Sequence, residues 1–82
     1  MVGLAEELAQ LRKALLSRAK TEEHYTLISE IASAETAAKT QNVSDLKQIL
    51  SKLKTIAGWT LNVAKEIGVS IAIKVLEARI IN

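Results

Sequence analysis

The C-terminal third of the chain is the feature that most restricts its fold, because it is too apolar for an ordinary surface segment. Between Thr55 and Ile81 the charged residues are confined to five positions, which are Lys65, Glu66, Lys74, Glu77 and Arg79. The chain has no Pro and only three Gly, so little in it interrupts a helix. Helical spacing predicts that this segment is apolar on two sides.

The two apolar faces are defined by residues three and four positions apart. One face contains Val69, Ile73, Leu76 and Ile80. The other contains Ile71, Val75 and Ala78. A helix that is apolar on two sides is normally buried on two sides, and a small bundle covers only one of them. The second side is therefore predicted to contact another molecule.

A β-strand is the alternative for this segment, because β-branched residues alternate at Val69, Ile71, Ile73 and Val75. A strand needs a partner strand, and the sequence offers no second candidate. The strand reading would require a sheet between chains, so the helix is favoured for Val69–Leu76.

Length and composition favour an all-α domain that needs help to be stable. The chain has 82 residues, which is enough for one domain, with no Cys and a single His. Disulfides and a metal site are thus excluded as stabilisers, and partner chains remain. Aromatic residues make up only 2% of the chain, so the core is expected to be aliphatic.

The pattern predicts a small three- or four-helix bundle in one domain, residues 1–82. The expected helices are 4–20, 22–39, 43–57 and 58–81, and the last is either continuous with its predecessor or kinked near Gly68. Leu4, Leu8, Leu11 and Leu15 form one stripe, and Tyr25, Leu27, Ile28 and Ile31 the apolar part of the second helix.

Capping signals separate the predicted helices. Thr21, followed by Glu22 and Glu23, is a plausible N-cap, which favours an antiparallel hairpin over one bent helix. Asn42 with Asp45 three residues later resembles a capping box, and Ser44 is the competing cap.

No group of residues suggests catalysis, and no metal or cofactor is expected. The pair His24–Tyr25 is the only one that resembles a proton-handling site, and nothing converges on it; the simpler interpretation is a surface His beside a packing Tyr. Residues 1–41 carry a net charge of −1 and residues 42–82 a net charge of +3, too little to indicate nucleic-acid binding. Five charges in the apolar segment argue against membrane insertion, and acidic residues near the start do not fit a secretory signal, so a cytoplasmic location is expected.

The sequence also predicts which residues contact a partner. The lone Trp59 is either a core anchor or an interface residue. The predicted interface residues are Trp59, Val63, Ile67, Ile71, Val75, Ala78 and Ile80.

The segment "LKTIAGWTLNVAKEIGVSIAIKVLEA" resembles the C-terminal module of the abortive-infection (AbiTii-type) family and related bacterial phage-defence proteins. The matching positions are Leu53-Lys54, Gly58-Trp59, Ala64, Ile67-Gly68 and Val69 to Leu76. The resemblance implies a non-enzymatic accessory helical module of a larger bacterial protein.

Together these features predict a non-catalytic module that forms homo-oligomers. The alternative is an adaptor, such as a death-like signalling bundle, that binds a different protein through the same C-terminal surface.

Overall fold

The computed structural model describes residues 2–52 and 57–81, and at residues 2, 50–52, 57 and 78–81 it describes the backbone only. The described residues form five α-helices: α1 (Val2–Arg18), α2 (Glu22–Lys39), α3 (Val43–Lys52), α4 (Ala57–Ile67) and α5 (Ser70–Ile81). The all-α class is confirmed, and residues 70–81 are helical rather than extended. The prediction of three or four helices, the last of them long and apolar, is wrong.

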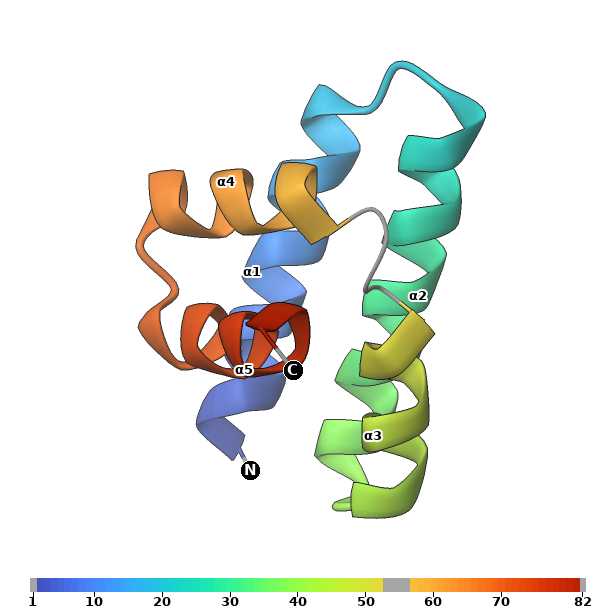
Figure 1. Ribbon diagram of the computed structural model, residues 1–82, viewed down its shortest axis with the longest axis vertical. Coiled ribbons are helices and arrows are strands. Elements are labelled where there is room, and N and C mark those ends of the chain that lie inside the picture. The colour runs from blue at the N-terminus through green and yellow to red at the C-terminus, as the bar shows by residue number, and fades with distance from the viewer. Residues whose placement is uncertain (1, 53–56, 82) are drawn as a thin grey trace.

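The first two helices form the antiparallel hairpin that the sequence predicted (Figure 1). The Thr21 hydroxyl caps α2 by accepting a hydrogen bond from the backbone N–H of His24 at 3.2 Å. His24 completes the turn, because its Nδ1 accepts a hydrogen bond from the Lys20 N–H at 3.1 Å. The two bonds together satisfy donors that the start of a helix would otherwise leave unpaired.

The hairpin buries a stripe of aliphatic side chains. All four leucines of the predicted stripe are buried, and Leu11 and Leu15 are completely so. Leu27 and Ile31 meet them from α2. The assignment of Tyr25 to the apolar part of this helix is wrong, since its side chain is 54% exposed. Helical periodicity places position 24 on the inner side of α2 instead.

A left-handed residue ends α2. Gln41 has φ of +56°, and the N–H of Asn42 donates to the Ala37 carbonyl at 2.9 Å. Asn42 then caps α3, since its Oδ1 accepts from the Asp45 N–H at 3.1 Å and its Nδ2 donates to the Asp45 carboxylate at 2.9 Å. The predicted Asn42 cap is confirmed, and the Asp45 carboxylate bonds to the Asn42 side chain rather than to its backbone N–H, as a complete capping box would require. The predicted helix 43–57 ends at Lys52, and residues 53–56 lie outside the described part of the chain.

Gly68 divides the predicted C-terminal helix into two. Its φ is +77°, a conformation that residues with a Cβ seldom adopt. The N–H of Val69 donates back to the Ala64 carbonyl at 3.2 Å, which closes a Schellman-type turn. The chain therefore reverses after Ile67, and α5 packs beside α4 instead of extending from it. Gly58, the first residue of the predicted helix 58–81, lies within the first turn of α4.

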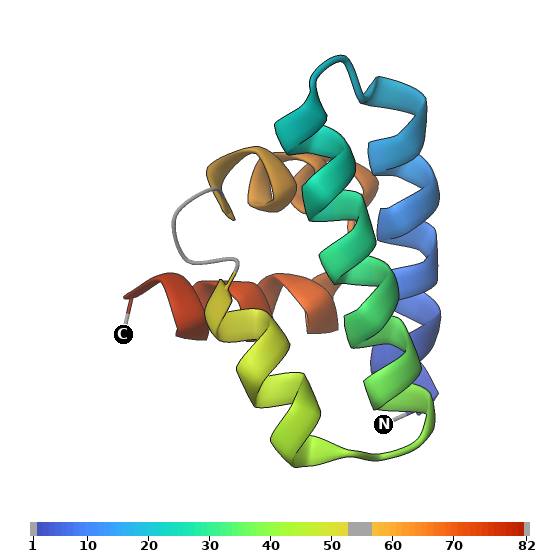
Figure 2. The same ribbon diagram turned by 90° about the vertical axis from the view of Figure 1, so that its right-hand side faces the viewer.

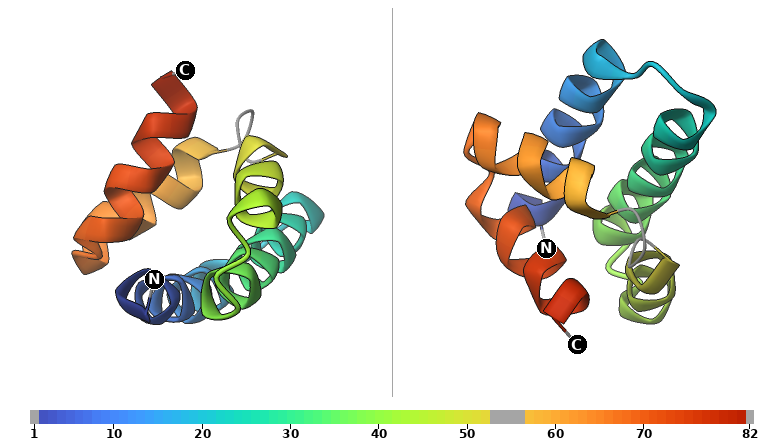
Figure 3. Two further views of the ribbon diagram at one scale, coloured as in Figure 1. Left: turned by 90° about the horizontal axis from the view of Figure 1, so that it is seen from below. Right: turned by 45° about the horizontal axis from the view of Figure 1, so that its top comes forward.

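The helices form two layers. Figures 2 and 3 show α1 and α2 in one layer, with α3, α4 and α5 all on the same side of them. A side chain from the first layer fixes the second: Glu7 on α1 accepts a hydrogen bond through Oε1 from the Ala72 N–H, 2.9 Å away in the first turn of α5. The opposite face of the hairpin is covered by no described helix.

Candidate interaction surfaces

The structure distributes the predicted interface residues over two helices with very different exposure. Val63 is buried in the chain's own core, so it offers no surface to a partner. Trp59, Ile67 and Val75 are partly buried against that core. Ile71 is 44% exposed. The side chains of Ala78 and Ile80 lie outside the described part of the structure.

The exposed part of this set lies on α5. Its inner face is formed by Val69, Ala72 and Leu76, which are almost completely buried. Ile71 and Val75 lie one helical turn apart on another side, and we refer to these two residues as the α5 strip. The strip reaches the start of α1, because a Cβ placed on Gly3 would lie 3.1 Å from Ile71 Cδ1. The starts of α1 and α5 thus lie close together beside the exposed Ile71.

Trp59 is engaged within the chain. Its ring stacks on the imidazole of His24, with centroids 3.8 Å apart and an angle of 7° between the planes. His24 belongs to the first turn of α2 and Trp59 to the first turn of α4, so this contact joins the two layers. The sequence interpretation of His24 as a surface residue beside a packing Tyr is reversed, because His24 packs and Tyr25 is exposed.

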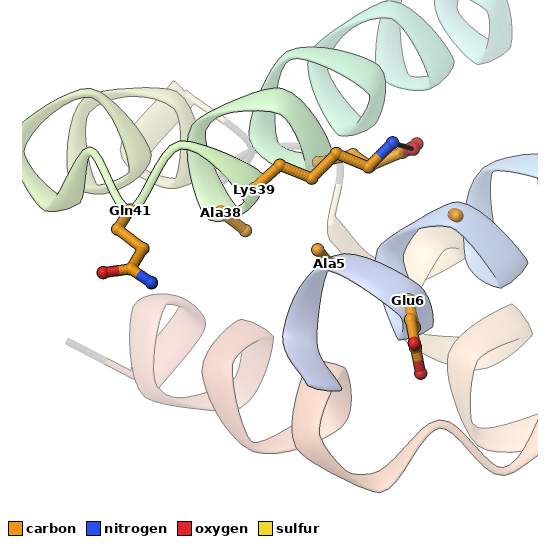
Figure 4. A pocket seen from close by; sticks show the side chains of 7 residues that line it. Ala5, Glu6, Ala38, Lys39 and Gln41 are labelled. Atoms are coloured by element: carbon orange, nitrogen blue, oxygen red, sulfur yellow. Dashed lines mark ion pairs between the residues drawn. The ribbon is translucent and has the colours of Figure 1, made fainter. Parts of the chain in front are cut away.

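A second surface, which the sequence interpretation did not include, lies on the open face of the hairpin. A depression of about 340 Å³ lies between α1 and α2. Ala5 and Ala38 lie on its two sides (Figure 4), Ala9 also lines it, and we call it the alanine pocket. The exposed residues Glu6, Lys39 and Gln41 surround it.

Glu35 forms one wall of the alanine pocket and holds the hairpin together there. Its Oε1 accepts a hydrogen bond from Arg12 Nε at 2.9 Å, and its Oε2 lies 3.3 Å from Lys39 Nζ. The Arg12 hydrogen bond lowers the pKa of Glu35, and Lys39 adds to this effect against the opposing effect of burial. A lowered carboxyl pKa stabilises the fold at neutral pH, and this contribution is lost as the pH falls below the usual carboxyl range.

Two of the most exposed apolar side chains lie at the other end of the same hairpin. Leu16, in the last turn of α1, is 52% exposed, and Tyr25, near the start of α2, is 54% exposed. The sequence does contain a signal for them. Leu16 follows Ala9 by seven residues, and Tyr25 precedes Ala32 by seven, so each pair shares one side of its helix.

The chemistry available at these surfaces is that of contact between apolar side chains. Among residues 2–52 and 57–81, no three His, Asp or Glu side chains gather where they could hold a metal ion. Within the same residues, every helix is too short or too polar to cross a membrane.

Comparison with known proteins finds no similarity that would assign a function. No protein family matches the chain, and neither the curated proteins nor the solved structures contain a significant match. These comparisons do not bear on the resemblance of the C-terminal segment to abortive-infection proteins. The function must be inferred from the surfaces described above.

Proposed function

We propose that the chain is a non-catalytic module that forms homo-oligomers, with the α5 strip in the contact. The observation that carries the proposal is the 44% exposure of Ile71 on a helix whose inner face is already covered by the chain's own core. Val75 continues the apolar surface by one turn. Ile73 does not belong to it, because a position two residues from both Ile71 and Val75 projects from a different side of the helix.

The surroundings of the α5 strip fit the usual construction of an interface, in which polar residues surround an apolar centre. Ser70 and Lys74 are exposed on the same helix, on either side of Ile71 in the sequence. An interface of ordinary size covers roughly 800 Å² per partner. The accessible surface of this chain is 4830 Å², so such a contact would cover about a sixth of it.

Self-association has a clear advantage for a chain this small. A domain of this length buries a modest apolar area, and its margin of stability is thin without disulfides or metals. A contact between copies adds buried apolar area at about 25 cal/mol per Å², reduced by the cost of association. Assembly also raises the effective concentration of anything attached to the module. The resemblance of residues 53–76 would make the attached protein a bacterial phage-defence protein.

Measuring the mass in solution by size-exclusion chromatography with light scattering tests the proposal. We expect the unmodified chain to be a multimer and Ile71→Lys to shift the mass toward the monomer. Val43→Lys is the matched control, because it places the same charge on a similarly exposed apolar residue of another helix, α3. Circular dichroism melting shows whether both variants stay folded.

A multimer that keeps its mass in Ile71→Lys would remove the α5 strip from the contact. A monomer at all concentrations would reject self-association. It would favour the adaptor function, in which the same surface binds a different protein.

A further inference from the structure

We propose that the open face of the hairpin is a two-fold contact between two copies of this chain, in which Leu16 and Tyr25 of each copy fill the alanine pocket of the other. This inference shares with the proposed function the claim that the chain self-associates, but it uses a different surface. The α5 strip lies at the layer of α3–α5, whereas this contact lies on the outer side of α1 and α2.

The first step is that the exposed side chains of Leu16 and Tyr25 lie on the same face of the hairpin as the alanine pocket. Leu16 lies seven residues after Ala9, which lines the pocket, and Tyr25 lies fourteen residues before Lys39, which also lines it. Positions seven apart in an α-helix differ in direction by about 20°. Both large side chains therefore project from the side of the hairpin that carries the pocket. Since α3, α4 and α5 lie on the other side (Figure 3), this face is open along its length.

The second step is that these two side chains and the alanine pocket lie at opposite ends of that face. Leu16 and Tyr25 flank the turn that joins α1 and α2. Ala5 and Ala38 lie near the first turn of α1 and the last turn of α2, at the far end of the hairpin (Figures 1 and 4). The midpoint between Leu16 and Ala5 falls near Gln10, and the midpoint between Tyr25 and Ala38 falls near Ala32.

The third step is symmetry. A two-fold axis that runs above these midpoints, between the two faces and perpendicular to the helices, reverses the second hairpin and lays its turn over the open end of the first. Each exposed pair then meets a pocket, and both contacts form at once. Such an interface is self-complementary and closes at two copies, as most symmetric dimers do. The hairpin face is about 25 Å long and about 20 Å wide, which is the scale of an ordinary interface.

Charge agrees with this arrangement. Glu6 beside the pocket and Lys13, one turn before Leu16, are both exposed. Within the described residues neither forms an ion pair. The two-fold axis brings the Glu6 end of one copy over the Lys13 end of the other. Arg12 and Glu35 lie between the two ends and already neutralise each other. The face thus offers opposite free charges where the axis requires them.

The first experiment measures the dimer dissociation constant by analytical ultracentrifugation. We expect Leu16→Lys and Tyr25→Glu each to weaken the dimer at least tenfold. Both positions are more than half exposed, and each new charge suits its end of the helix, so the fold should persist. Val43→Glu is the matched control: it changes a 49% exposed apolar residue on α3 and should leave the constant unchanged. A dimer that resists Leu16→Lys and Tyr25→Glu overturns the inference.

The second experiment reads the geometry directly, because the natural chain has no cysteine. The variant Ala5→Cys/Leu16→Cys should form a disulfide-linked dimer on mild oxidation. Within one copy the two positions are about 16 Å apart along the helix axis, too far for a disulfide. Val43→Cys should remain monomeric under the same oxidation. Equal cross-linking of the two variants would contradict the proposed contact.

The two self-association surfaces are distinguished by comparing the same variants. Loss of the multimer in Leu16→Lys but not in Ile71→Lys supports the hairpin contact and rejects the α5 strip. Loss in Ile71→Lys alone rejects the hairpin contact and leaves the proposed function standing. A monomeric unmodified chain rejects both.

Discussion

The N-terminal hairpin and the C-terminal pair α4–α5 are held by different kinds of interaction. The hairpin is specified locally, by the Thr21 cap, its leucine stripe and the turn between its helices. The C-terminal pair depends on distant residues, since Glu7 caps α5 and His24 stacks on Trp59. It also carries a buried defect, because the fully buried Thr60 hydroxyl has no hydrogen-bond partner in the described part of the chain. The hairpin is therefore the scaffold on which the second layer is assembled.

The largest expected effect tests the scaffold. Leu11→Ala removes a side chain with no exposure from the leucine stripe, and should lower the free energy of unfolding by about 2–5 kcal/mol. Urea unfolding followed by circular dichroism measures it. Leu16→Ala is the control, with the same residue type on the same helix but 52% exposed, and should change stability by under about 0.5 kcal/mol in the monomer. Equal losses would contradict the assigned burial.

The next prediction tests the dependence of the second layer on the first. Glu7→Ala removes the acceptor for the Ala72 N–H and should cost about 1 kcal/mol, as loss of an N-cap does. Hydrogen exchange should show lower protection in α5 than in α2, because only α5 loses its cap. Glu6→Ala changes the neighbouring exposed glutamate and serves as the control. A uniform loss of protection in both helices would mean that the layers do not differ in the proposed way.

The buried defect predicts a gain in stability. Thr60→Val replaces the unpartnered hydroxyl with a methyl group of similar shape, and should stabilise the fold by about 1 kcal/mol. Thermal melting measures the change. Thr60→Ser keeps the hydroxyl and removes the methyl group, so it should destabilise. If the valine variant melted below the unmodified chain, the hydroxyl would have a partner in solution.

The smallest effect compares the two left-handed turns. Gln41 ends α2 and Gly68 ends α4, both with positive φ. Gln41→Gly should stabilise by about 0.5 kcal/mol, because glycine adopts this conformation without steric cost. Gly68→Ala should destabilise by about 1 kcal/mol. No atom lies within 4 Å of the added Cβ at Gly68, so the cost would come from the backbone alone. Chemical denaturation measures the free energy of unfolding of both variants. A gain in Gln41→Gly together with a loss in Gly68→Ala would show that the turn has its best residue after α4 and a less suitable one after α2.

The residues that could be predicted are those whose role is decided within a few positions of the chain. The caps at Thr21 and Asn42 and the stripe from Leu4 to Leu15 follow from spacing alone, and the structure confirms them. The interpretation of His24 and Tyr25 followed residue type, which favours burial of the tyrosine, although position 24 is the one in line with Leu27 and Ile31. The stacking partner Trp59 lies in another helix, so the sequence did not reveal what covers the histidine.

The prediction of the interface residues also depended on contacts with other helices, which the sequence did not reveal. The apolar pattern of residues 58–81 is continuous, so it suggested one long helix with a bare side. The sequence suggests a kink near Gly68, but the spacing of the apolar residues does not reveal that the φ of Gly68 is positive and that the chain reverses there. After the reversal α5 lies beside α4, Val63 is buried in the core, and Ile71 is the most exposed of the predicted interface residues whose side chains the structure describes. The open face of the hairpin was missed because the leucine stripe identifies the covered side only.

Helix propensity, periodicity and capping act between residues that are near in the chain, so the all-α class, the hairpin and its caps could be predicted from the sequence. Which apolar residues of the C-terminal third are covered, and which side chain lies at the start of α5, became known only from the packing of the helices. Burial is shared between helices: whether an apolar side chain meets water depends on where the neighbouring helix lies, and spacing along one helix does not contain that information.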